Sequence, residues 1–436
     1  MTIELEITHF SKQINIPDEE LEGILQVASW QIEPQFPYPG RTAWHILKKP
    51  IHLKNAGNGT LHAAKLKGIG GWNPENAHLF SGIRNMSFND KPIKPTTQEY
   101  EFTSSIAHFG FTDQGGFQTV HSEPAPYCGI LHRRAVLEYE NQHRMLANGV
   151  PSLVPLLVAR LPESYKFNQE DMGIVVSLSE EKEPFRLHLI HFGENELREQ
   201  EHKYYTDLRR SLGIKGNICD EKIRLQTINA LTGQIGRLMH GFSAAGLYRH
   251  SGGWEDLSFC VRNKQVFLVD LDSSLLLSEL PACVRPLQIL RDLSSSIHKL
   301  LNMFYFPTLI DKYNFSNLVA YDPIFKLLSA YFPASHAGKI KSIADRFWNF
   351  FAPHLFLMKR NLDQISNESG IEQRKTFKVD DEIFYTLSLL NLFPLYEESD
   401  LNSIFPSEFS LDDLKERSSV FLGERHQYVD YLLADL

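Results

Sequence analysis

The chain has 436 residues, of which 42% are hydrophobic and 22% charged, so it is long enough for two or three lobes with sizeable cores. Its net charge of −9 argues against nucleic acid as the main partner, and no apolar run reaches the roughly 18 residues that span a membrane. The four cysteines form no CxxC pair, and the first residues, MTIELEITHF, lack a signal pattern, so we expect a soluble cytoplasmic protein.

The first half predicts short strands around one prominent helix. The segment RRAVLEYENQHRMLANGVP (133–151) has an apolar and a polar face and predicts a helix that stops at Asn148–Gly149. The polar, Gly-rich residues 72–123 predict a long insertion with a hairpin or two. Buried strands are predicted at GTLHAAKLKGIGG (59–71), SLVPLLVARL (152–161) and GIVVSL (173–178).

The second half predicts mainly helices. The segment 220–242 predicts a long helix ending at His240–Gly241, and a hairpin flanked by acidic residues follows within 252–274. Further helices are predicted at 284–305, 318–332 and 337–359. These patterns favour an α+β fold with two lobes, a β-rich N-lobe over 1–180 and a helical C-lobe over 181–436.

Four chemically useful features occur in a fixed order along the chain. They are a strand lysine, a helix glutamate, a His-Gly segment after a long helix, and acids on both sides of a hairpin. Protein-kinase-like enzymes have this order, with a lysine on the nucleotide phosphates, a glutamate holding the lysine, and two loop residues holding Mg²⁺. Each feature alone is ordinary, because strand lysines usually lie on the surface and acids after strands usually cap turns. The joint order indicates a bilobal protein-kinase-like fold.

Two segments carry a family resemblance. KLKGIGG (65–71) resembles the QLKGAGPT segment of the selenoprotein O family of kinase-like protein adenylyltransferases. PAPYCGILHRRAVLEYENQHRMLANGVPS (124–152) is similar to that family's PTPYSR…GRAVLR…REFL…SEAMHALGIPT run, and the proline lies thirteen positions after the glutamate in both. The segments 240–259 and 183–192 more faintly resemble its HGVMNTDNMSI and SHIRFGHFE motifs. The similarity is remote and covers residues 60–275 discontinuously.

The resemblance implies roles for individual residues. Lys67 matches the phosphate-binding lysine, with Lys65 as a rival, and Glu138 matches its helix partner, with Glu140 as a rival. The remaining matches are Glu255 for the proposed base, Asp256 for a metal-binding asparagine, Asp270 (or Asp272) for the second metal ligand, and Arg186 and Arg134 for phosphate-binding arginines. Gly57, Gly59 and Gly68 would allow backbone to approach phosphates, although plain turns are the favoured explanation for them.

The chain also departs from the family pattern. Phe242 stands two residues after His240, where a kinase has its base, and His240 lies sixteen residues before Asp256 rather than seven. Residues 243–254 would then form an insertion from which Arg249 or His250 could face the substrate, although a core or surface position is the simpler expectation for either. Leu178 stands where the second phosphate arginine is expected. No redox cysteine is found near the end of the chain.

The resemblance implies a transferase that uses ATP with Mg²⁺ or Mn²⁺ and moves AMP onto a hydroxyl group of a protein. The first alternative is a kinase that phosphorylates a protein or small molecule with Glu255 as its base. A pseudokinase scaffold that binds nucleotide is the second, and a metal hydrolase built on His240, His250 and the acids is the least favoured, because its spacing matches no common ligand motif. The expected partners are a nucleotide and a hydroxyl acceptor, without nucleic acid or membrane.

Overall fold

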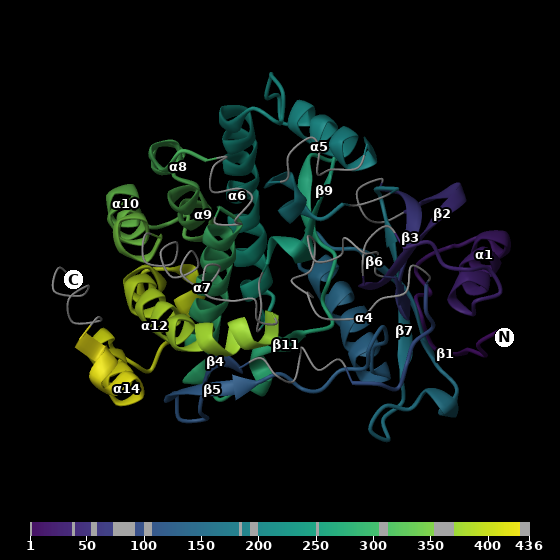
Figure 1. Cartoon of the computed structure of the whole chain (residues 1–436), viewed down its shortest axis with the longest axis horizontal. Helices are drawn as coiled ribbons and strands as arrows, with labels where there is room; N and C mark the ends of the chain where they lie inside the picture. The colour runs from purple at the N-terminus through teal and green to yellow at the C-terminus, as the bar shows by residue number, and fades with distance from the viewer. Residues whose placement is uncertain are drawn as a thin grey trace.

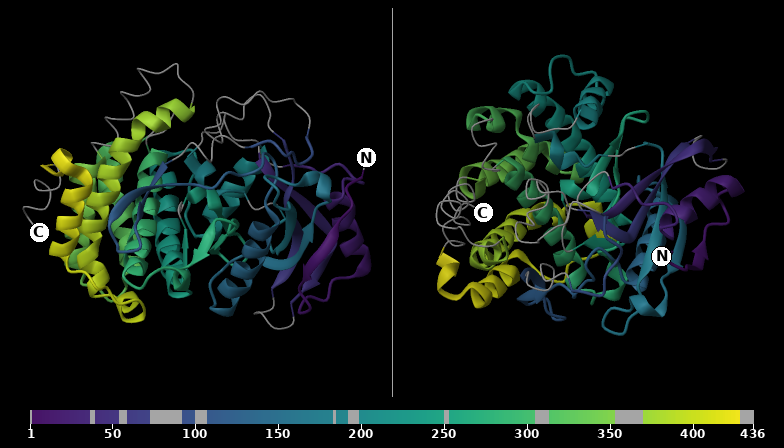
Figure 2. Two further views of the ribbon diagram at one scale, coloured as in Figure 1. Left: turned by 90° about the horizontal axis from the view of Figure 1, so that it is seen from below. Right: turned by 45° about the vertical axis from the view of Figure 1, so that its right-hand side comes forward.

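The computed structural model shows a β-sheet at one end of the molecule and a group of packed helices at the other (Figure 1). It describes residues 2–36, 40–53, 59–72, 92–99, 107–182, 185–191, 199–249, 253–304, 313–352 and 370–427. Both views of Figure 2 show α1 (Asp18–Ala28) and α14 (Leu411–Leu422) far apart. Among the described helices, none is long and apolar enough to cross a membrane.

The sheet has five antiparallel strands. Its order is β1 (Glu6–Phe10), β6 (Val154–Arg160), β7 (Gly173–Ser179), β3 (Thr60–Trp72) and β2 (Gly40–His52). Helix α1 (Asp18–Ala28) covers one face and α4 (His132–Ala147) the other. Strand β7 shows the alternation, because Ile174 and Val176 join the core with α1 while Val175 packs with α4.

The helical part has one large hydrophobic core. Within it, α6 (Glu221–Ala244) packs against α9 (Pro323–Tyr331), and α7 (Val284–Phe304) packs against α12 (Gly370–Glu397). The other described helices are α5 (Glu199–Ser211), α8 (Phe315–Tyr321), α10 (Ala337–Arg346), which continues into a π-helical turn (Phe347–Phe351), and α13 (Asp400–Ile404).

Three small antiparallel pairs complete the described strands. They are β4 (Ala107–Phe111) with β5 (Phe117–His121), β8 (Leu247–Arg249) with β11 (Ser274–Leu276), and β9 (Leu257–Cys260) with β10 (Gln265–Leu268). The β9–β10 hairpin touches the sheet part, since the Leu153 amide donates to the Leu268 carbonyl at 3.3 Å and the Leu268 amide donates to the Pro151 carbonyl at 3.2 Å. The residues between β10 and β11 therefore lie where the sheet meets the helices.

Most of the predicted elements are confirmed. Strands β3, β6 and β7 and helices α4, α6 and α7 lie within a few residues of their predicted bounds. Within the described part of the insertion, residues 107–121 form an expected hairpin. The helix predicted at 318–332 is wrong as a single unit, because Asp322 takes a left-handed conformation (φ 46°) before Pro323 and separates α8 from α9. The lobe boundary at 180 stays a prediction.

The predicted loop at His240–Gly241 is wrong. Helix α6 continues to Ala244, and the Nδ1 atom of His240 lies 2.8 Å from the carbonyl oxygen of Tyr331 on α9. Gly241 did not end the helix, because its place against Val150 favours a residue without a side chain inside a packed helix. The chain then forms β8, which ends at Arg249.

Candidate functional site

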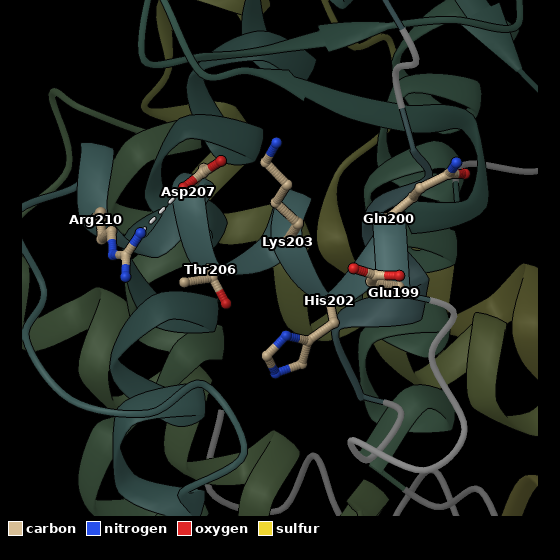
Figure 3. A pocket seen from close by; sticks show the side chains of 7 residues that line it. All are labelled: Glu199, Gln200, His202, Lys203, Thr206, Asp207 and Arg210. Carbon is tan, nitrogen blue, oxygen red and sulfur yellow. Dashed lines mark hydrogen bonds and ion pairs between the residues drawn. The ribbon is translucent and has the colours of Figure 1, made fainter.

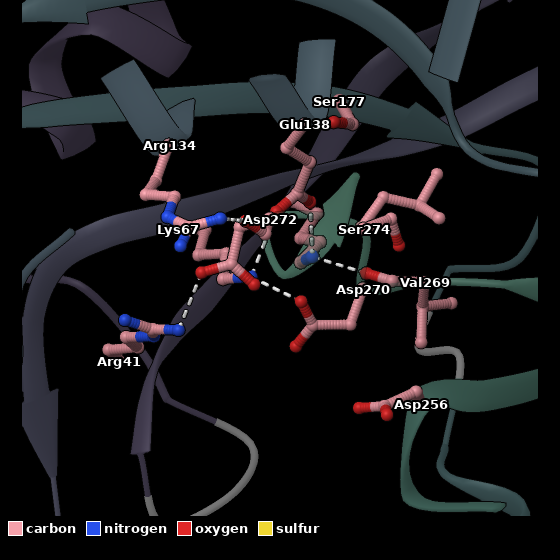
Figure 4. A network of polar contacts seen from close by, with 12 residues as sticks. Arg41, Lys67, Arg134, Glu138, Ser177, Asp256, Val269, Asp270, Asp272 and Ser274 are labelled. Atoms are coloured by element: carbon pink, nitrogen blue, oxygen red, sulfur yellow. Dashed lines mark hydrogen bonds and ion pairs between the residues drawn. The ribbon is translucent and has the colours of Figure 1, made fainter. Parts of the chain in front are cut away.

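The centre of the site is the ammonium group of Lys67 (Figure 4). It lies 2.8 Å from a carboxylate oxygen of Glu138 and 2.6 Å from one of Asp272, and it also forms an ion pair with Asp270. The four residues come from strand β3, helix α4 and the segment between β10 and β11. The structure thus brings three of the predicted site residues, Lys67, Glu138 and Asp270, into direct contact.

The strand period explains why a lysine enters the interior here. Residues 65 and 67 project from the same face of β3, opposite Ser177 and Val175 of β7, and this is the face that α4 covers. Both lysine side chains are only 1% exposed. Lys65 donates to the other oxygen of Glu138 at 2.9 Å, so one carboxylate holds two ammonium groups. Both predicted lysine candidates therefore reach the site.

Glu138 is held in place by its own helix and by the sheet. Gln142, one turn later on α4, donates to Glu138 at 3.4 Å and accepts a hydrogen bond of 2.8 Å from the Ser177 hydroxyl on β7. Glu140, the predicted rival, is exposed on the opposite side of the helix. Helical geometry therefore supports Glu138 over Glu140 as the partner of the lysines.

The segment that carries Asp270 and Asp272 is fixed by side chains from the sheet part. Asn141 of α4 donates to the carbonyl of Ser274 at 2.8 Å and to that of Leu271 at 3.4 Å. Arg41 of β2 forms a 2.8 Å ion pair with Asp272 and donates to the Gly129 carbonyl at 3.0 Å. Arg41 was not among the predicted residues, because nothing near it in the sequence marks it as different from a surface arginine.

The ionic contacts keep these groups charged. Burial raises the pKa of Asp270, but Lys67 and Lys65 outweigh this and hold it well below its usual value. Glu138 behaves in the same way, since the two lysines lower its pKa against the effect of burial. Burial lowers the pKa of Lys67, yet Asp270, Asp272 and Glu138 together raise it above the ordinary value. Lys65 differs, because its burial outweighs its partners and lowers its pKa.

Carboxylate oxygens of Glu138, Asp270 and Asp272 all lie within 4.8 Å of one another. Oxygen donors at this spacing suit Mg²⁺, which binds one or two carboxylates and completes its coordination with water and phosphate oxygens. Glu138 already contacts two lysines, whereas Asp270 and Asp272 lie on one short segment that faces the same side. The donor set therefore fits a divalent cation held chiefly by the two aspartates.

Asp256 lies beside this group but contacts another cation. Its carboxylate pairs with Arg249, and its carbonyl accepts a hydrogen bond of 3.0 Å from the Val269 amide, directly before Asp270. Burial raises the pKa of Asp256 to about 6, with Asp270 and Glu255 adding to the effect and Arg249 opposing it. Arg249 lies seven residues before Asp256. Seven is the spacing of the kinase pattern, which His240 does not have. His250 lies outside the described residues.

Glu255 contacts the helical part of the protein through its carboxylate. It pairs with Lys299 of α7 at 2.7 Å, and its carboxylate folds back toward Gly253. Burial raises its pKa, but Lys299 outweighs this and lowers it. The Glu255 side chain keeps 41% of its surface exposed, so it is accessible from solvent. Lys299 is a residue that sequence reasoning missed, since no motif marks it within α7.

The other predicted residues lie around the centre. Arg134 donates to the Asp272 carbonyl at 3.4 Å and pairs with Glu123 at 2.9 Å. Burial and the lysines have the largest effects on the pKa of Asp270, and burial and Arg249 on that of Asp256. Arg186 makes a smaller contribution that lowers the pKa of both carboxyls. Gly68 has a φ of 90°, and a Cβ there would lie 2.2 Å from Ile130, so packing alone accounts for this glycine. Gly57 lies outside the described residues.

A hollow lies on α5, and its lining shares no residue with this group (Figure 3). It has a volume of about 590 Å³ and is open to solvent. Its described lining consists of side chains of mixed charge from α5: Glu199, Gln200, His202, Lys203, Thr206, Asp207 and Arg210. Asp207 and Arg210 form a 3.4 Å ion pair across one turn, which is ordinary for an exposed helix face. None of the predicted site residues belongs to this hollow.

The comparisons with known proteins are sparse. No protein-family model matches the chain, and no curated protein matches it. Among solved structures, the chain is similar to "WaaP in complex with acyl carrier protein", with 12% identity and a TM-score of 0.31. That match covers 57% of this chain and 84% of the other.

Proposed function

We propose that this protein is a nucleotide- and Mg²⁺-dependent transferase with a protein-kinase-like, two-lobed arrangement. The observation that carries the proposal is the ammonium group of Lys67, which contacts Glu138 of α4 and Asp270 after β10. Kinase-like enzymes use such a lysine on the nucleotide phosphates, such a glutamate to hold it, and such an aspartate to bind Mg²⁺. Two elements of the chain, β8 and the β9–β10 hairpin, lie between the long helix and Asp270 in the corresponding order.

The proposed chemistry needs positioning and neutralisation of charge more than covalent catalysis. Lys67 supplies a fixed positive charge, while Asp270 with Asp272 or Asp256 would hold the metal ion. Arg134 and Arg186 are the candidates for further phosphate contacts. The bound ion would neutralise phosphate charge and orient the nucleotide.

Of the two transfer reactions, we favour transfer of AMP to a hydroxyl group of a protein. In a kinase, the catalytic loop begins with the HRD motif, and the base is the aspartate two residues after the histidine. If Arg249 takes the place of that histidine, the position of the base is Ser251. Serine is not a base, which is the departure that also characterises the selenoprotein O family. Phosphoryl transfer is the second candidate, because the exposed carboxylate of Glu255 lies next to Asp256 and is kept ionised by Lys299.

Label transfer from ATP tests the proposal. The purified chain is incubated with Mg²⁺ and ATP labelled on either the α- or the γ-phosphate, with a cell lysate as the source of acceptors. We expect covalent label from the α-phosphate alone, and label from the γ-phosphate alone would instead establish a kinase. Asp270→Asn should reduce transfer by at least about 100-fold, because it removes a metal ligand and a partner of Lys67. Absence of both ATP binding and label transfer would reject the proposal.

A further inference from the structure

Strand β3 places two lysines in the site, although one is sufficient to contact phosphates. Both are 1% exposed and both lie against Glu138. Burying a second ammonium group costs roughly several kcal/mol, as for any buried ion, unless its partners are very well arranged. Lys65 therefore has a structural or functional task of its own.

The contacts of Lys65 differ from those of Lys67. Lys65 donates to Oε1 of Glu138 at 2.9 Å and to the carbonyl oxygen of Val269, whereas Lys67 contacts Oε2 of Glu138 and the carboxylates of Asp270 and Asp272. Val269 directly precedes Asp270, and its amide donates to the Asp256 carbonyl at 3.0 Å. Lys65 thus contacts Val269, which precedes Asp270 in the chain and is hydrogen-bonded to Asp256, and both of these aspartates are predicted metal ligands.

We propose that Lys65 is a positioning residue that fixes the metal-binding segment, while Lys67 is left to contact the nucleotide. One ammonium group connects strand β3, helix α4 and the peptide before Asp270, since it bonds to both Glu138 and Val269. Without it, Glu138 loses one of its two cations and the Val269 carbonyl loses its donor. The inference rests on the proposed function, because it assigns the two lysines to metal positioning and to phosphate contact respectively.

The test separates the two lysines by their dependence on metal. Lys65→Met and Lys67→Met each remove one charge at nearly constant length, and ATP binding is measured by calorimetry in a Mg²⁺ titration and again with a chelator. For Lys65→Met we expect the Mg²⁺ concentration at half-saturation to rise about 10-fold or more, while binding of metal-free ATP changes little. For Lys67→Met we expect ATP binding to weaken in both conditions. An unchanged Mg²⁺ requirement in Lys65→Met would overturn the inference, as would equal losses of metal-free binding in both variants.

Hydrogen exchange supplies a readout that needs no nucleotide. Amides of residues 266–274 should exchange faster in Lys65→Met than in the wild type, and unchanged exchange there would also overturn the inference. Lys48→Met is the matched control, because Lys48 lies on neighbouring β2 with its side chain 70% exposed. Lys65→Gln, which keeps one N–H donor, replaces Lys65→Met if that variant does not fold. Wild-type protein that binds no ATP rejects the proposed function, while the exchange measurement still decides the role of Lys65.

Discussion

At the scale of single residues, the site is a balance of buried charges. Three carboxylates, on Glu138, Asp270 and Asp272, face the cations of Lys65, Lys67 and Arg41. Replacing such ion pairs by apolar side chains is often neutral or stabilising, so their presence is weak support for a role in stability. Oxygen ligands and a buried ammonium group are, in contrast, what a metal–nucleotide complex requires. The proposed function therefore accounts for this cluster better than a role in folding does.

The buried Asp292, outside the candidate site, predicts pH-dependent stability. Asp292 of α7 accepts hydrogen bonds from the Arg249 amide and, at 2.9 Å, from Gln288. Burial raises its pKa to about 7 despite the opposing effect of Arg291. The folded state then binds more protons than the unfolded state between the two pKa values, so this group's contribution to stability is greatest at low pH and is lost as pH rises toward about 7.

The variant Asp292→Asn measures this effect. Its amide oxygen can still accept from Arg249, but it does not titrate, so we expect the wild type to lose about 1–2 kcal/mol more stability than the variant between pH 5 and pH 8. Urea denaturation at the two pH values gives the free energy of unfolding for each protein. Parallel pH profiles for the two proteins would show that Asp292 has an ordinary pKa.

At the scale of elements, the sequence allowed prediction of whatever has a strong local period. Strand β3 and helices α4, α6 and α7 were predicted because their apolar residues recur at strand or helix spacing. Helix α12 was missed, since Pro394 lies inside it and the side chains of its described part, residues 382–396, are buried on all sides rather than on one stripe. The end of α6 was misplaced, because a glycine required by helix packing was interpreted as a helix terminator.

The β4–β5 hairpin shows how an insertion acquires a structural role. It lies between β3 and α4 in the sequence, yet it packs on α7, α12 and α14 in the helical part (Figure 1). The ring of Phe109 stacks on Tyr385 of α12 with centroids 5.9 Å apart, and the Phe109 carbonyl accepts a 3.1 Å hydrogen bond from Arg291. The hairpin therefore attaches the chain that leads into α4 to helices α7, α12 and α14.

Phe109→Ala tests the strength of that connection. Phe109 is 3% exposed, so its loss should destabilise the protein by about 3–5 kcal/mol through lost burial and a remaining cavity. The control is Phe315→Ala, because Phe315 is 42% exposed and its removal should cost under about 1 kcal/mol. Thermal or urea denaturation compares the two, and similar small losses in both variants would mean that the hairpin is not firmly attached.

At the scale of the whole molecule, the site depends on contacts that no local pattern encodes. The Lys67 ammonium meets Glu138 across 71 residues and Asp270 across 203 residues of sequence. Residue types and their order suggested Lys67, Glu138 and Asp270, but the sharing of Glu138 by two lysines and the contact of Arg41 with Asp272 depend on strand pairing and on how the helices meet the sheet. The contact of Glu255 with Lys299 has the same origin, because the two residues lie 44 positions apart in the sequence.

The same long-range assembly predicts that ligands stabilise the molecule as a unit. A nucleotide with Mg²⁺ would bind where β3, α4 and the segment between β10 and β11 meet, and a ligand that binds only the folded state at 100 times its Kd adds about 2.7 kcal/mol. We expect the Tm to rise by roughly 2–5 °C with ATP and Mg²⁺, and by less with ATP and a chelator. In Asp270→Asn the further rise due to Mg²⁺ should disappear, whereas Asp207→Asn on α5 should respond as the wild type does. A full Mg²⁺ response in Asp270→Asn would place the metal elsewhere, and a lost response in Asp207→Asn would direct attention to the hollow on α5.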